Sequence, residues 1–202
     1  MERYEPKNIF TWIDAFIAET TSPHHLAILK NYRRHGIFEV TGNWEWILTP
    51  EMTVDDPHYR INLGGGTLVL DGKEAVGEFY EGLKQTGLMS TFGPIREQFL
   101  VGDWGLASHG LWGHQIPGAV AIEQGHEIDD PNAFYNVTVL QATVWHYTPD
   151  ARLIGEHIFE DPGSRTIEKL DPADVLTPDE AMEPILKLLA DELEREPLPT
   201  AR

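Results

Sequence analysis

The segment 132–147 constrains the fold most, because large apolar side chains alternate with other residues over most of its length. Successive side chains of a β-strand point to opposite faces of the sheet, so every second residue shares a face. The residues that share one face here are Tyr135, Val137, Val139, Gln141, Thr143, Trp145 and Tyr147. The segment therefore predicts one long strand with this face turned toward the core.

The rest of the chain predicts helices first and strands afterwards. Helices are expected over 7–20, 23–35, 44–48, 73–85 and 178–194, and strands over 52–57, 95–101, 105–116, 132–147 and 152–161. Gly36 is expected to end the second helix. This order is typical of an α+β fold, in which a curved antiparallel sheet wraps around N-terminal helices and leaves a conical pocket.

Two regions are expected in the chain. Residues 1–165 form a single α+β barrel domain, and residues 166–202 form a C-terminal extension with one helix. A capping box, Thr177 followed three residues later by Glu180, marks the start of that helix. The segments 62–67 and 117–131 are predicted to be loops, because Gly, Pro and acidic residues concentrate there.

Composition excludes several classes of partner. The chain of 202 residues has a net charge of -18, which would repel both nucleic acid and anionic membrane surfaces. It has no Cys, so thiolate metal sites and Cys nucleophiles are excluded. No signal peptide is apparent at the N-terminus, and no apolar run is long enough to span a bilayer. We therefore expect a cytoplasmic protein.

One short segment, 52–57, carries a candidate general base. If it is a strand, Met52, Val54 and Asp56 share one face. A carboxylate at the end of an apolar stripe can lie at the wall of a pocket, where desolvation raises its pKa and makes it a base near neutral pH. The alternative is a solvated loop of two acids and a proline.

Three motifs lie in order along the chain: Thr53–Pro57, Gly72–Tyr80 and Ala151–Pro162. Together they resemble the nuclear transport factor 2-like superfamily, which includes ketosteroid isomerase, scytalone dehydratase, limonene epoxide hydrolase and the SnoaL-like polyketide cyclases. The resemblance implies that Asp56 is a catalytic base and Asp161 a second acid–base residue.

The same resemblance implies an oxyanion donor. Tyr32 precedes Asp56 by 24 positions, which is similar to the spacing in ketosteroid isomerase, and a Tyr hydroxyl can donate to a developing enolate. Tyr59 is a further donor candidate. The isomerase's second donor would fall near Thr143, which cannot copy it. The Asp-Arg-Asp set of the epoxide hydrolase has no clear counterpart. Each of these residues also has a purely structural interpretation.

Two histidines are candidates for a second acid–base role. His109 could match the strand His of the superfamily's dehydratases, and His157 would share a strand face with Asp161. Either could instead be a satisfied structural His. A metal site built from His58, His109, His157 and Asp56 is the competing chemistry, but no metal-binding motif is present, so we expect no metal and no cofactor.

The function expected is a cofactor-independent acid–base enzyme, of the lyase, dehydratase or isomerase type. It would act by proton abstraction or elimination on a hydrophobic cyclic or aromatic small molecule, which the Trp content favours. The residues expected to contact this substrate are His58, Tyr59, Trp112, Gln141, Thr143 and Trp145. The alternative is a non-catalytic small-molecule-binding or assembly domain. The resemblance also implies a homodimer.

Overall fold

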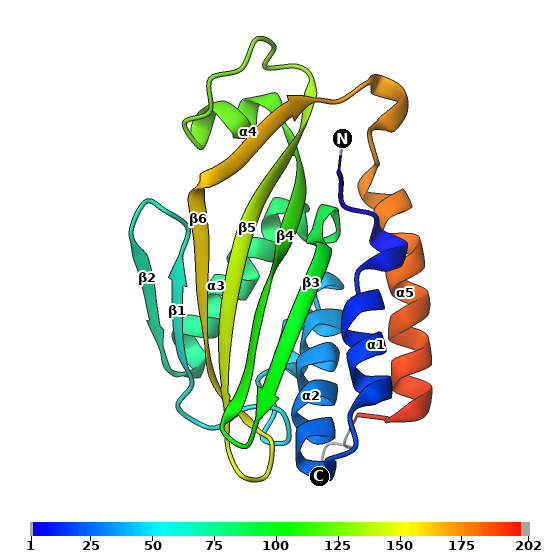
Figure 1. Cartoon of the computed structure of the whole chain (residues 1–202). Helices are drawn as coiled ribbons and strands as arrows, with labels where there is room; N and C mark the ends of the chain where they lie inside the picture. The colour runs from blue at the N-terminus through cyan, green and yellow to red at the C-terminus, as the bar shows by residue number, and fades with distance from the viewer. Residues whose placement is uncertain (1, 199–202) are drawn as a thin grey trace.

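The computed structural model describes residues 2–198, and its centre is one six-stranded sheet with the order β2-β1-β6-β5-β4-β3 (Figure 1). The strands are β1 (His58–Asn62), β2 (Thr67–Asp71), β3 (Phe92–Gly102), β4 (Gly105–Pro117), β5 (Phe134–Tyr147) and β6 (Leu153–Lys169). The helices are α1 (Thr11–Glu19), α2 (Pro23–Val40), α3 (Gly72–Thr86), α4 (Gly118–Glu123) and α5 (Pro178–Arg195). Short 3-10 turns lie at Pro6–Asn8, Trp44–Trp46, Met89–Thr91 and Pro172–Asp174.

The predicted α+β class is confirmed, with two corrections to the sheet. Strands β3 to β6 pair antiparallel with their neighbours, but β1 pairs parallel with β6, so the sheet is mixed. It is also an open sheet with edge strands β2 and β3, and not a closed barrel. The predicted inner face of β5 is confirmed, because all seven alternating residues from Tyr135 to Tyr147 are buried.

Helices α2 and α3 cover one face of this sheet, which we call the inner face, and α1 and α5 lie beside the β3 edge (Figure 1). Helix α2 starts as predicted, with Pro23 at its first position and the Ser22 side chain accepting from the His25 amide. It does not end at Gly36. The ring of Phe10 packs where a Gly36 side chain would lie, at 3.0 Å from the position of a Cβ, so glycine permits a close helix contact there.

The predicted strand over 52–57 is wrong. Only Thr53 makes a bridge, to Leu153, and the strand begins after Pro57. The Thr53 hydroxyl donates to the Ile47 carbonyl 2.7 Å away, which fixes the chain in a turn. Two short elements were not predicted. They are strand β2, which forms a hairpin with β1 across the glycine-rich turn, and helix α4 inside the predicted loop 117–131.

The C-terminal helix α5 packs into the same core as the sheet. Its capping box is confirmed at Thr177, and Ile185 is fully buried. Arg33 of α2 donates to the Glu192 carboxylate at 2.8 Å, which ties the two helices together. The predicted boundary at 165 falls inside β6, which continues to Lys169. Within residues 2–198, no helix combines the length and apolar character needed to cross a membrane.

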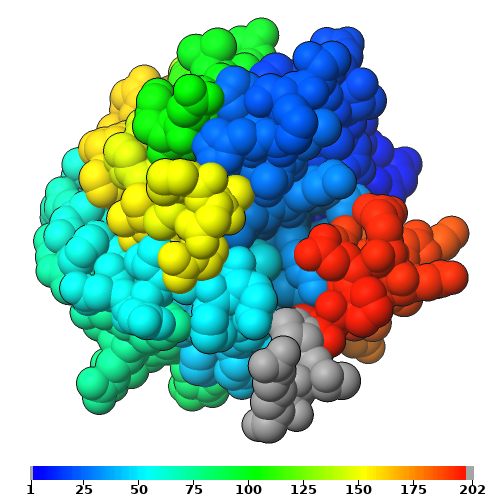
Figure 2. Space-filling model, turned by 90° about the horizontal axis from the view of Figure 1, so that it is seen from below, coloured from blue at the N-terminus to red at the C-terminus, as the bar shows by residue number. Residues whose placement is uncertain are grey.

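One end of the inner space is closed by three segments distant in sequence. The Asn31 side-chain amide donates to the backbone carbonyls of Met52 and Ala151, at 2.9 and 3.1 Å. Figure 2 shows this end from below, with the yellow turn near residue 150 against the cyan segment before β1 and the blue start of α2. These contacts place Tyr32, one residue further along α2, inside the fold.

Candidate functional site

Polar side chains gather between α2, α3 and the inner face of the sheet, where a hydrophobic core would be expected. We call this set the inner polar cluster. Its members are Tyr32, His35, Glu39, Tyr59, Tyr80, Glu97, Ser108, Thr143, Trp145, Tyr147 and Glu156. Positions 32, 35 and 39 lie on one face of α2, since residues three and four apart on a helix are neighbours. The strand residues come from the inward half of the alternation in β1, β3, β4, β5 and β6.

A hydrogen-bonded chain links α2, α3 and β1. His35 Nε2 lies 2.8 Å from the Tyr80 hydroxyl, which donates to the Tyr59 hydroxyl at 3.3 Å. Assigning the Tyr80 proton to Tyr59 makes His35 Nε2 the donor to Tyr80. Burial lowers the pKa of His35 to about 3, so its imidazole is neutral at physiological pH. Burial also raises the pKa of both tyrosines well above 10, so both remain protonated donors.

Two carboxyl groups, Glu39 and Glu156, lie beside this chain. Glu39 Oε2 is 3.6 Å from His35 Nε2. Its side chain is 30% exposed, yet it lies deep enough for burial to raise its pKa to about 7. Glu156 is 3% exposed, and burial raises its pKa, with a further rise from the negative charge of Glu39. Within residues 2–198, no hydrogen bond or ion pair compensates the Glu156 carboxyl. Its buried charge is unfavourable, which favours the protonated acid.

A third carboxyl group belongs to a second hydrogen-bonded chain. The Tyr32 hydroxyl donates to Glu97 Oε1 at 3.3 Å, Glu97 also accepts a hydrogen bond from Ser108, and Ser108 pairs with Thr143 at 2.8 Å. Burial raises the pKa of Glu97 to about 7 although both hydrogen bonds lower it. This carboxyl group therefore changes its protonation near neutral pH.

Trp145 lies between the two chains. Its ring is 4.8 Å from the ring of Tyr32 and 4.7 Å from that of His35. Glu156 is its cross-strand partner. Among residues 2–198, the buried Trp145 Nε1 has no hydrogen-bond partner, nor has His35 Nδ1. Buried polar groups without partners are costly in free energy and often mark positions where a ligand binds.

Several residues predicted from the sequence lie on the inner face. Tyr32, Tyr59, Thr143 and Trp145 belong to the inner polar cluster, Tyr32 from α2 and the others from the sheet. Gln141 is buried on the same face of β5, two residues from Thr143. Trp112 is also on the inner face, next to Val139 of β5. The catalytic and binding roles assigned to these residues stay predictions.

The structure does not place Asp56 with these residues. The Asp56 side chain is 77% exposed, so the expected desolvation of this carboxylate is wrong. The physical reason is that residues 54–57 form a turn at the sheet edge and not an inward-facing strand. His58 lies at the same edge, 45% exposed, where its Nδ1 is 2.8 Å from Asp71 Oδ1. The solvated-loop interpretation of Asp56 describes the geometry.

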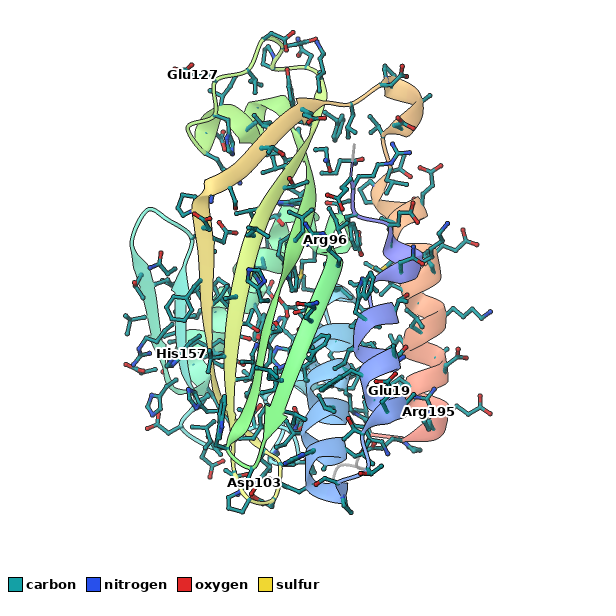
Figure 3. All side chains as sticks on the ribbon, viewed as in Figure 1. Glu19, Arg96, Asp103, Glu127, His157 and Arg195 are labelled. Carbon is teal, nitrogen blue, oxygen red and sulfur yellow. The ribbon has the colours of Figure 1, made fainter. Side chains whose placement is uncertain are left out.

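His109, His157 and Asp161 also lie away from the inner face. His109 is exposed beside Ala142 on the outer face of the sheet. The ring of His157, labelled in Figure 3, is 5.1 Å from the ring of His146 on that same outer face. Asp161 is exposed, and its carboxylate accepts from the Gly163 amide in a local turn. The expectation that His157 and Asp161 line the interior is wrong, because the register with β5 turns Glu156 inward instead.

The three carboxyl groups were missed for identifiable reasons. The predicted end of α2 at Gly36 left Glu39 outside the helix. Glu97 shares its strand face with the buried Phe99, which was the available signal. Each face of the strand that contains Glu156 carries both polar and apolar residues, so the sequence does not show which face is inward. The pairing of Glu156 with Trp145 decides it.

The two main surface grooves lie elsewhere. One of about 380 Å³ lies between the N-terminal segment and residues 170–184, and one of about 340 Å³ lies on the outer sheet face beside Arg96. Neither contains a member of the inner polar cluster. The buried groups of the inner polar cluster are the better candidate for a site, because ionisable groups with shifted pKa values gather there and the two grooves contain none of them. In the part of the chain described, no group of three His, Asp or Glu residues is arranged to hold a metal ion.

No protein-family model matches this sequence, and no curated protein matches it. Solved structures similar to the chain include the epoxide hydrolase/cyclase-like enzyme SalBIII of salinomycin pyran ring formation. It has 13% identity, covers 70% of this chain and 95% of its own, and gives a TM-score of 0.48. A CaMKII hub from S. rosetta has 11% identity, covers 70% of this chain and 99% of its own, and gives 0.43.

A third solved structure is an NTF2-like protein with a cystatin-like fold from Novosphingobium aromaticivorans. It has 17% identity, covers 66% of this chain and 79% of its own, and gives a TM-score of 0.39. The likeness concerns the fold alone.

Proposed function

We propose that this protein is a cofactor-independent acid–base enzyme and that Glu39 is its general base. The proposed reaction removes a proton from carbon, or eliminates a small group, on a hydrophobic cyclic or aromatic molecule. The observation that carries the proposal is the position of Glu39: its carboxylate lies 3.6 Å from His35 Nε2 at the inner polar cluster, and 30% of its side chain is exposed. In this position burial raises its pKa to about 7. A base with a pKa near the working pH combines a large unprotonated fraction with a useful proton affinity.

Glu156 is the second carboxyl group of the proposed site. Two carboxyl groups that interact inside a protein do not both ionise readily, so one proton is retained by the pair. The negative charge of Glu39 adds to the effect of burial in raising the pKa of Glu156, so Glu156 keeps the proton. A protonated Glu156 leaves Glu39 as the carboxylate that reacts.

Tyr59 is the proposed donor to the developing oxyanion. Its hydroxyl accepts from Tyr80, and its own proton has no acceptor among residues 2–198. Burial keeps its pKa well above 10, so it donates without ionising. A fixed donor in a site that excludes water stabilises negative charge strongly in the transition state. The neutral His35 ring donates to the Tyr80 hydroxyl, so the Tyr80 proton points to Tyr59.

A carbon-acid probe tests this proposal without knowledge of the natural substrate. Nitrobenzisoxazole is flat and aromatic. A base removes its ring C–H proton, the electron pair forms the nitrile, and the N–O bond breaks to release a coloured phenolate. We expect turnover that rises with pH through about 7, as the pKa of Glu39 requires. Glu39→Gln is expected to lower the rate by roughly 100-fold or more.

The matched control is Glu45→Gln, the same chemical change at an exposed position just after α2. It should keep the wild-type rate. If circular dichroism shows that Glu39→Gln is folded and its rate equals that of wild type, Glu39 is not the general base. A wild-type rate no greater than that of free carboxylate in buffer would support the non-catalytic binding or assembly function instead.

A further inference from the structure

A second group of polar atoms without partners lies on the inner face, beyond the inner polar cluster. Trp112 and His114 are neighbours on the inward half of β4, and same-face neighbours in a strand are about 7 Å apart. Trp112 Nε1 and His114 Nε2 are both buried, and neither has a hydrogen-bond partner in the part of the chain that the structure describes. Phe92 of β3 joins them, with its ring 5.1 Å from that of Trp112 and 5.5 Å from that of His114.

The surroundings of these atoms are apolar. The cross-strand partners in β5 are Val139 beside Trp112 and Val137 beside His114. Val137 also belongs to a small separate hydrophobic cluster with Ile116 and Ala121 of α4. An acceptor oxygen carried by an apolar molecule would satisfy the Trp112 N–H and place apolar surface against these valines.

We propose that Phe92, Trp112 and His114 form a second subsite, which binds the far end of an elongated apolar substrate through a carbonyl or ether oxygen. The Trp112 indole donates to this oxygen, because an indole N–H can act only as a donor. The Phe92 ring packs against the aromatic or cyclic part of the molecule. Burial lowers the pKa of His114 to about 4, so its ring contributes no charge there. The subsite rests on the proposed function in one respect: both take the inner face of the sheet as the surface that binds the substrate.

The subsite connects to the catalytic groups along the sheet. Gly110, two residues before Trp112 on β4, pairs with Glu97 on one side and with the buried Gln141 on the other. Measured along the strands, Glu97 and Trp112 are therefore about 7 Å apart. A molecule that binds at Trp112 and reacts at the inner polar cluster would therefore carry its oxygen acceptor at least this far from its reacting carbon.

Two probes of nearly the same shape test the subsite. Fluorenone and fluorene are both flat, three-ring molecules, and only fluorenone carries a carbonyl oxygen. We expect wild type to bind fluorenone roughly fivefold or more tightly than fluorene, because an acceptor for a buried donor contributes about 1 kcal/mol or more. Trp112→Phe keeps an aromatic ring but removes the N–H, and should abolish this preference. The control Trp104→Phe, at a Trp that is 51% exposed, should retain it.

A second measurement uses the wild-type protein, so it does not depend on the variant folding. The indole N–H resonance of Trp112, assigned by its absence in Trp112→Phe or by sequential NMR, should move downfield when fluorenone is added and not when fluorene is added. No binding of fluorenone, no preference over fluorene, or a preference that survives Trp112→Phe would overturn the subsite. Loss of nitrobenzisoxazole turnover with an intact carbonyl preference would overturn only the proposed catalysis.

Discussion

The inner and outer faces of the same strands differ in what surrounds their ionisable groups. Glu156 and His157 are adjacent in β6, yet Glu156 is 3% exposed beside Trp145, whereas His157 lies on the outer face with His146. The inner carboxyl groups have raised pKa values because burial removes the water that stabilises their charge. The difference shows that exposure decides which acids in this chain can act as bases near neutral pH, whatever motif surrounds them.

The largest expected effect concerns the inner face at Gly110. A Cβ at this position would lie 2.3 Å from the Arg96 carbonyl oxygen and 3.0 Å from Glu97 Cα, both backbone atoms. Gly110→Ala should therefore lower the free energy of unfolding by about 3 kcal/mol, because the paired strands must separate locally. Urea denaturation measures this. Gly82→Ala is the matched control: its Cβ meets nothing within 4 Å, and it should stabilise α3 by about 0.5 kcal/mol. Equal stabilities would contradict the close pairing.

Glu97 should make the stability of the protein depend on pH. Its pKa is about 7 in the folded protein and near 4.5 when unfolded, so its contribution is present below the lower value and lost as pH rises through the higher. Relative to wild type, Glu97→Gln should gain on the order of 3 kcal/mol of unfolding free energy between about pH 5 and about pH 8. Glu168→Gln, at an exposed position of β6, should show no such gain. A parallel pH profile for wild type and Glu97→Gln would mean that this carboxyl is not desolvated.

Adjacent residues of β6 give a sharper test of the two faces. Burial and the charge of Glu39 raise the pKa of Glu156 in the folded protein, so its contribution to stability is lost as pH rises above the ordinary Glu value. Relative to wild type, Glu156→Gln should therefore gain unfolding free energy as pH rises. His157→Asn changes the next residue, on the outer face, and should show no gain of this kind. Urea denaturation of each variant at several pH values measures this, and a gain with His157→Asn but none with Glu156→Gln would reverse the assignment of the faces.

The smallest effect is expected at Asp56, the base that the sequence favoured. Its side chain is 77% exposed and lies outside the inner polar cluster. Asp56→Asn should therefore change nitrobenzisoxazole turnover by less than about twofold, since solvated surface groups contribute little to catalysis or stability. The rate is compared with that of Glu39→Gln under the same conditions. A loss as large as that of Glu39→Gln would restore the role implied by the family resemblance.

The sequence predicted those parts of the fold that depend on local periodicity. The alternation over 132–147 identified the inner face of β5, and the capping box at Thr177 identified the start of α5. Trp145, Thr143 and Gln141 were placed correctly because their orientation follows from a period of two within one strand. The short segment 52–57 failed because a strand needs a partner along its length, and local sequence does not show that this one has a partner only at Thr53.

Local sequence patterns were enough to predict the α+β class, the long buried strand and the presence of tyrosines on the inner side of the fold. Which carboxyl groups are buried depends instead on how distant segments pack together. A one-residue change of register in β6 would have turned His157 inward and Glu156 outward, and the sequence of β6 permits either. The pairing with β5 and the packing of α2 past Gly36 bring Glu156 and Glu39 together, and pKa depends on such neighbours and on lost water, not on sequence position.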